Sequence, residues 1–191
     1  PRCWHNQDVR GVLLALTYLS TQTASSDSSL SFTSGIDSTY DAYEFHFVNI
    51  HPQTGGSHLQ FQVNADGQTG FNETMTTTNF RAYHNESDSD TAFDYSTTHD
   101  QAQGTSYQTF ASNVGAENDE SMSGILTLYA PSSTTYVKHF VIRAAHYQHS
   151  DYAFDTYVAG YINTTSAIDE IDFKFSSGNI DAGKIHLYGV S

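Results

Sequence analysis

Basic residues are scarce in this chain, and their scarcity excludes one large class of partners. Lysine and arginine together number 7 among 191 residues, whereas aspartate and glutamate number 21, which gives a formal net charge of −14 at pH 7. Such a molecule repels a phosphate backbone unless its few cations are clustered. We therefore expect no nucleic-acid partner.

Cysteine and long apolar runs are equally scarce. The single cysteine, Cys3, cannot form a disulfide within the chain, so the stability of the fold does not depend on crosslinks. No run approaches the roughly 20 apolar residues of a membrane-spanning helix, and we expect no membrane span. The signatures of a nucleophile elbow, a phosphate-binding loop and a zinc-protease helix are missing as well. We therefore predict no catalytic residues and no enzymatic activity.

The longest apolar stretch, Gly11 to Leu19, lies near the N-terminus. Its length and the preceding Arg10 resemble a short signal-peptide core, but no small-x-small cleavage site follows closely. Two interpretations remain open: residues 1–19 form an arm that docks onto a neighbour or an assembly, or they form the first strand of the core. The arm would make its assembly contacts through its apolar side chains, namely Val12, Leu13, Leu14, Leu16 and Leu19.

Alternation of apolar and polar residues dominates residues 20–191, for which we expect a single β-sandwich domain. Aromatic residues make up 14% of the sequence and can fill one core. The pattern is clearest at the end of the chain, where Ile171, Phe173 and Phe175 alternate with polar residues. A connection rich in glycine and asparagine follows, with apolar Ile180 at its centre, and leads to a second alternating run. This predicts two half-buried strands joined by a loop with a buried plug.

The same alternation predicts further strands. Residues 41–50 and 59–63 each place apolar side chains on one face, and the glycines between them favour a hairpin. Residues 64–121 are rich in Thr, Ser, Asn and Asp, so we expect long polar loops there, with one strand near 80–83 and a short helix near 107–113. Strands return at 122–128, 136–147 and 151–162. About nine strands and almost no helix indicate an all-β fold, an antiparallel, jelly-roll-like β-sandwich.

Acidic loops and tyrosines provide the candidate binding residues. The clusters at 86–90 and 117–120 offer oxygen ligands suited to calcium, namely Asp88, Asp90, Glu117 and Asp119. A solvated polar loop is the competing interpretation, because no EF-hand register is present. No other cofactor is expected. Tyrosines in or beside the irregular region can stack on sugar rings, and these are Tyr83, Tyr95, Tyr107 and Tyr147. Packing beneath a loop is the alternative for each.

Two histidines, His146 and His149, form a possible zinc pair in the sequence. They are three residues apart, and an odd separation places two side chains on opposite faces of a strand. Joint zinc binding would need a bulge, so we expect none.

Four segments carry a resemblance to a known family: S-F-T-S-G-I-D-S-T-Y-D (31–41), F-V-N-I-H-P (47–52), S-G-I-L-T-L-Y-A-P-S-S-T-T-Y-V-K-H-F (123–140) and F-S-S-G-N-I-D-A-G-K-I-H-L-Y-G (175–189). Together they resemble virion structural proteins encoded by marine tailed phages, over about nine tenths of the chain from Ser20 onward. The resemblance implies a jelly-roll-like β-sandwich exposed on the particle, as a capsid decoration or as part of a tail fibre. It transfers no catalytic residues.

These observations favour a structural protein located in the virion, with other virion proteins and further copies of itself as partners. Its polar, mostly uncharged composition suits display in a crowded array. A glycan-binding module for host recognition is the second hypothesis. A polysaccharide-degrading enzyme is the third and the least favoured, since nothing in the sequence fixes two carboxylates at the separation that sugar hydrolysis needs.

Overall fold

The computed structural model describes residues 15–191. Within that range the chain forms thirteen strands and no helix, so the predicted all-β class is confirmed. The strands are β1 (Leu16–Thr23), β2 (Leu30–Phe32), β3 (Ala42–Pro52), β4 (Ser57–Ala65), β5 (Met75–Asn85), β6 (Thr91–Tyr95), β7 (Gln101–Gly104), β8 (Gln108–Val114), β9 (Met122–Tyr129), β10 (Lys138–Gln148), β11 (Tyr152–Ile162), β12 (Ile168–Phe175) and β13 (Ile180–Val190). Residues 15–191 accordingly contain no helix that could cross a membrane.

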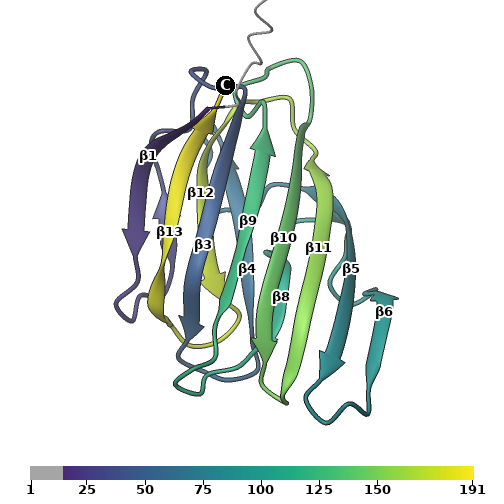
Figure 1. Cartoon of the computed structure of the whole chain (residues 1–191). Coiled ribbons are helices and arrows are strands. Elements are labelled where there is room, and N and C mark those ends of the chain that lie inside the picture. Colours follow the sequence, from purple (N-terminus) through teal and green to yellow (C-terminus); the bar gives the residue numbers. More distant parts are fainter. Residues whose placement is uncertain (1–14) are drawn as a thin grey trace, which may run out of the picture.

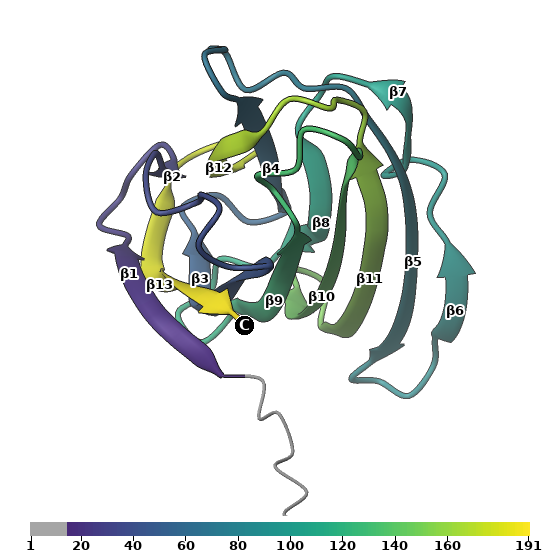
Figure 2. The same cartoon turned by 90° about the horizontal axis from the view of Figure 1, so that it is seen from above.

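The antiparallel strands form two layers, as predicted for a sandwich (Figures 1 and 2). The front layer has the order β1-β13-β3-β9-β10-β11-β5, and both β6 and β7 pair with β5. The back layer has the order β8-β4-β12-β2. Strand β10 joins the layers, because it pairs with β9 and β11 over most of its length and with β8 only where Gln148 is opposite Val114. The sandwich is therefore nearly closed into a barrel.

Aromatic side chains from both layers fill the core, as the alternation predicted. Phe173 of β12 is fully buried, and its ring lies 5.1 Å from that of Phe47 and 5.5 Å from that of Phe45, both from β3. It also contacts Phe61 of β4 at 6.4 Å and Phe110 of β8 at 6.5 Å. These edge-to-face and tilted contacts join the two layers across the middle of the sandwich.

The two ends of the described chain lie at the same pole of the sandwich. Leu16, at the start of β1, is opposite Val190, at the end of β13. The turns that join β10 to β11 and β5 to β6 lie at the other end of the strands (Figure 1). We refer to these ends as the terminal pole and the hairpin pole.

The predicted hairpin between the third and fourth strands is wrong. Strand β3 pairs with β13 and β9, whereas β4 pairs with β12 and β8, so the turn at residues 53–56 crosses from the front layer to the back. The last two strands also lie in opposite layers. Ile180, predicted at the centre of their connection, is the first residue of β13 and is completely buried. Consecutive strands on opposite layers are a jelly-roll trait that local turn residues do not reveal.

The predicted helix at 107–113 is also wrong, and residues 64–121 contain strands β5 to β8 where mainly loops were expected. The reason is a polar interface between β5 and β8. Thr77 Oγ1 donates to Gln108 Oε1 at 2.8 Å, and Asn79 Nδ2 donates to the carbonyl oxygen of Thr109 at 3.2 Å. All four side chains are buried. Because hydrogen bonds rather than apolar contacts join these strands, the apolar alternation is missing from this part of the sequence.

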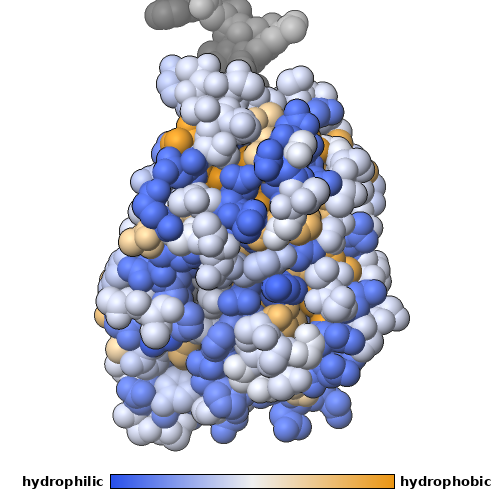
Figure 3. All heavy atoms as spheres, turned by 180° about the vertical axis from the view of Figure 1, so that it is seen from behind, coloured by the Kyte–Doolittle hydropathy of each residue, from blue (hydrophilic) through white to orange (hydrophobic). Residues whose placement is uncertain are grey.

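The back face is mainly hydrophilic (Figure 3). Gln62 of β4 is fully buried beneath the loops that cover it. Its Nε2 donates to the carbonyl oxygens of Glu73, Thr105 and Ser106 at 3.0 to 3.2 Å. Because these hydrogen bonds join Gln62 to the loops, they hold the covering loops on the sheet.

Of the five predicted assembly residues, three lie outside the described residues and two lie within residues 15–191. Val12, Leu13 and Leu14 lie outside the described residues. Leu16 and Leu19 belong to β1, the edge strand that pairs with β13. Leu16 is 49% exposed, whereas Leu19 packs against the core.

Candidate functional site

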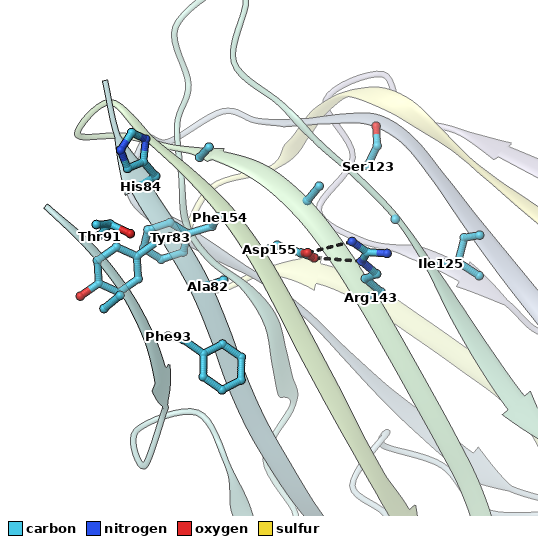
Figure 4. Close-up of a pocket in the computed structure, with 14 residues that line it drawn as sticks. Ala82, Tyr83, His84, Thr91, Phe93, Ser123, Ile125, Arg143, Phe154 and Asp155 are labelled. Atoms are coloured by element: carbon cyan, nitrogen blue, oxygen red, sulfur yellow. Dashed lines mark hydrogen bonds and ion pairs between the residues drawn. The ribbon is translucent and has the colours of Figure 1, made fainter. Parts of the chain in front are cut away.

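A hollow of about 940 Å³ lies on the outer face of the front layer, across β9, β10, β11, β5 and β6 (Figure 4). We refer to it as the outer groove. Its residues come from the first positions of β9, β11 and β6 and from the last positions of β10 and β5. The outer groove therefore lies toward the hairpin pole, away from Leu16 and Val190.

Strand register explains the floor of the outer groove. Ser123 of β9 is opposite Ala145 of β10, and Ala145 is opposite Asp155 of β11. Asp155 is in turn opposite Ala82 of β5, and Ala153 shares the face of Asp155 because it lies two residues away on the same strand. Small side chains thus lie next to one another on neighbouring strands, and they form the depressed floor of the groove.

An aromatic cluster borders the outer groove on its terminal-pole side, and Phe93 is its member that lines the groove. Tyr157 of β11 is opposite Phe80 of β5, and their rings stack with centroids 5.1 Å apart and planes inclined by 6°. Phe93 of β6 packs on Phe80 at 5.5 Å. Phe93 is nevertheless 71% exposed. A ring that is held by a neighbour and still open to solvent is ready to contact an apolar ligand surface.

Arg143 of β10 provides the cationic group of the outer groove. Its Nε donates to Asp155 Oδ1 at 3.1 Å and its Nη2 to Asp155 Oδ2 at 2.9 Å, a two-point contact visible in Figure 4. Its guanidinium also lies 5.2 Å from the ring centre of Tyr157. The hydrogen bonds to Asp155 raise the pKa of Arg143. The Arg143 side chain is 66% exposed, so the pair adds little stability. Its main effect is to hold the guanidinium in one orientation with further N–H donors free.

The hairpin-pole side of the groove is polar. His84 and Thr91, on neighbouring strands, form this rim. A second hollow of about 330 Å³ shares Ser123, Ala145 and Ala153 with the outer groove and is also lined by Tyr147. The two hollows together extend the surface toward the hairpin pole.

The structure does not bring the four predicted sugar-stacking tyrosines together. Tyr83 borders the outer groove, but its ring stacks on Phe154 with centroids 5.3 Å apart, on the opposite face of the sheet from Asp155 and Phe93. Tyr147 borders the second hollow, and Tyr95 lies on the edge strand β6. Tyr107 lies on the back side of the sandwich, beside β8. Two of the four are thus near the candidate site.

Tyr107 belongs to a structural network rather than to the groove. Its hydroxyl donates to Asp172 Oδ2 at 2.8 Å, and the hydroxyl of Ser31 donates to the other oxygen of the same carboxylate at 2.5 Å. The ammonium of Lys174 lies 3.8 Å from the Tyr107 ring centre. Burial and the bond to Asp172 raise the pKa of Tyr107, so its hydroxyl remains a donor. This network satisfies a carboxylate that is only 3% exposed.

Sequence reasoning missed the main groove residues, Phe93, Arg143 and Asp155. Each occupies a polar or irregular position of the alternation, where a side chain is expected to face solvent. Their one sequence signal is indirect: small residues at 145 and 153 share an exposed face with Arg143 and Asp155. Only the register of β10 and β11 shows that these residues are neighbours.

The structure does not assemble the four predicted calcium ligands, which are Asp88, Asp90, Glu117 and Asp119. Asp88 pairs with His84 Nε2 at 3.0 Å, and Asp90 accepts the hydroxyl of Tyr152 at 3.0 Å. The other two lie in the separate connection between β8 and β9. In the described part of the chain, no three His, Cys, Asp or Glu residues are placed to hold a metal ion. The four predicted ligands thus lie in two separate loops and do not form one site, and calcium binding by either loop stays a prediction.

Three histidines are partly or fully buried: His146 on β10, His58 on β4, and His99 in the connection between β6 and β7. His146 of β10 is 5% exposed, and its Nε2 lies 2.8 Å from the carbonyl oxygen of Ser112. Its Nδ1 is buried without a partner among the described residues. The rings of His58 and His99 are 5.3 Å apart, and burial lowers the pKa of both. His149, by contrast, is exposed beyond the end of β10, so His146 and His149 do not share a face.

Comparison with protein-family models, curated proteins and solved structures gives no significant match. Functional inference therefore depends on the geometry of the sandwich and its groove, together with the sequence resemblance.

Proposed function

We propose that this protein is a non-enzymatic structural component of a virus particle, present in several copies and exposed on the particle surface as a capsid decoration or a tail-fibre part. The polarity of the fold is the observation that carries the proposal. Both ends of the described chain lie at the terminal pole, and the outer groove lies toward the hairpin pole. A protein that is anchored at one end and contacts a partner at the other needs this arrangement.

The surface near the terminal pole supports an attachment role. Strand β1 is an edge, and among residues 15–191 it pairs only with β13. Its Leu16 and Tyr18 are 49% and 58% exposed. An exposed, partly apolar edge strand favours pairing with another chain. We assign the docking role to the predicted arm of residues 1–19, whose residues Leu16 and Leu19 belong to this edge strand.

Deletion of residues 1–14 tests the proposal, because it removes most of the predicted docking arm of residues 1–19 and leaves β1 in place. The shortened chain is expected to keep the β-sheet circular dichroism and the unfolding midpoint of the full chain. It is expected to be absent from purified particles of the encoding phage, as measured by co-sedimentation and immunolabelling. The matched control is Phe93→Ala, which alters the hairpin-pole side and is expected to associate normally.

Two results contradict the proposal at different levels. A full-length chain that never co-sediments with particles removes the virion role. A shortened chain that associates as well as the full chain removes the docking role of residues 1–14, and attachment would then depend on the β1 edge.

A further inference from the structure

We propose that the outer groove binds a neutral glycan, specifically an oligosaccharide that presents C–H faces and vicinal hydroxyl groups. The inference rests on the proposed function, since it names the partner that the exposed side of a particle protein would meet. It assigns direct contact to Phe93, Arg143 and Asp155.

The groove combines the two kinds of surface that a sugar ring requires. A pyranose has an apolar face of C–H groups and a rim of hydroxyls that both donate and accept hydrogen bonds. The exposed ring of Phe93 and the alanines of the floor match the apolar face. Arg143 supplies free N–H donors and Asp155 supplies carboxylate oxygens, side by side, as neighbouring hydroxyls need. Ligand sites commonly pair an apolar lining with a few fixed polar groups.

The contact groups are already held in place. Asp155 and the Tyr157 ring fix the guanidinium of Arg143, and Phe80 supports the ring of Phe93 from behind. Side chains that are ordered before binding lose little rotamer freedom when a ligand arrives. A small loss of side-chain entropy matters more for a weakly hydrophobic, flexible ligand such as a glycan than for a protein partner.

Charge selects a neutral ligand over the alternatives. The chain carries a formal net charge of −14, so an anionic polymer is repelled at long range. The one cation of the groove, Arg143, already forms an ion pair with Asp155. An uncharged polyhydroxyl chain meets neither penalty.

The groove also has the length for several sugar rings. It crosses five strands, and four spacings of about 4.8 Å between neighbouring strands give a span of about 19 Å. The second hollow beside Tyr147 lengthens it further. An oligosaccharide therefore fits better than a single sugar.

A glycan array followed by titration calorimetry with the full-length protein tests the inference. Saturable binding to neutral oligosaccharides is expected. Phe93→Ala should weaken it by about tenfold, the value of one lost stacking contact. The matched control is Tyr136→Ala, which removes another strongly exposed aromatic ring, 73% accessible, outside the groove and should leave the affinity within about twofold. Both variants remove exposed side chains, so unchanged unfolding midpoints verify the fold.

A second variant distinguishes recognition from general surface effects. Asp155→Asn removes the charge that neutralises Arg143. It should weaken binding of neutral glycans and strengthen binding of glycans that carry carboxylates, a change of preference that a merely structural role of Asp155 would not produce.

Several outcomes overturn the inference. On the array, the inference fails if the unaltered protein binds no neutral glycan or binds only anionic glycans. In calorimetry, it fails if Phe93→Ala and Tyr136→Ala lose the same affinity. It also fails if the array stays empty and sedimentation shows self-association that Phe93→Ala abolishes. A protein that joins particles but binds no glycan refutes this inference alone. One that binds glycans but never joins particles refutes the virion role and leaves the groove assignment intact.

Discussion

His146 is predicted to make this protein sensitive to mild acid. Its Nε2 faces the carbonyl oxygen of Ser112, which can only accept, so Nε2 carries the proton of the neutral ring. The buried Nδ1 has no partner, and a second proton there would be an unsatisfied buried charge. Burial lowers the pKa of His146 to about 4, and the nearby positive charges of Arg81 and His58 act in the same direction.

The difference between the pKa of His146 in the folded and unfolded states sets the sign and size of the change in stability with pH. In the unfolded chain the histidine has its ordinary pKa of about 6.5, so between pH 6.5 and 4 the unfolded state binds the proton and the folded state does not. The free energy of unfolding therefore falls as the pH falls through this window. At about 1.4 kcal/mol per pH unit the gap amounts to about 3 kcal/mol, a large share of the stability of a small domain. His58 and His99, whose pKa values are also lowered, add in the same sense.

Urea unfolding at pH 7, 6, 5 and 4 provides the assay. His146→Gln removes the titrating group. Between pH 7 and pH 4, the unfolding free energy of this variant should fall by up to about 3 kcal/mol less than that of the unaltered protein. His139→Gln is the matched control, because His139 lies exposed on the opposite face of β10. Carboxylates that titrate near pH 4 affect all three proteins alike. A decline in His146→Gln as steep as in the unaltered protein, or equal flattening in both variants, would refute this reasoning.

Two further predictions concern stability. Phe173→Ala should lower the unfolding free energy by about 3–5 kcal/mol in chemical denaturation, because the fully buried ring joins both layers and its loss leaves a cavity; a loss below about 1 kcal/mol would show that the core collapses around the gap. Tyr107→Phe should cost about 1–3 kcal/mol, since buried Asp172 loses a donor, whereas Tyr95→Phe, which removes an exposed hydroxyl, should stay within about 0.5 kcal/mol. Equal effects of the two tyrosine variants would contradict the structural role of Tyr107.

The sequence by itself determined which side chains are inside. Alternation identified Tyr43, Phe45 and Phe47 of β3 as one buried face and Ile180 as a plug, and the structure buries all of them. It also identified the all-β class. A period of two is a local property, visible in a few consecutive residues, and the preference of apolar side chains for the interior acts on each strand separately.

Only the tertiary structure decided which strands are neighbours. The turn after β3 predicts a hairpin, yet β3 pairs with β13 and β9, which are distant in the sequence. The polar contact of Thr77 with Gln108 has no apolar signature at all. The groove has the same origin: Arg143 and Asp155 are twelve residues apart, and their contact exists only because β10 and β11 pair in one register. The short turn at residues 149–151 sets that register, and a single-residue slip would turn these side chains to the other face and abolish the site.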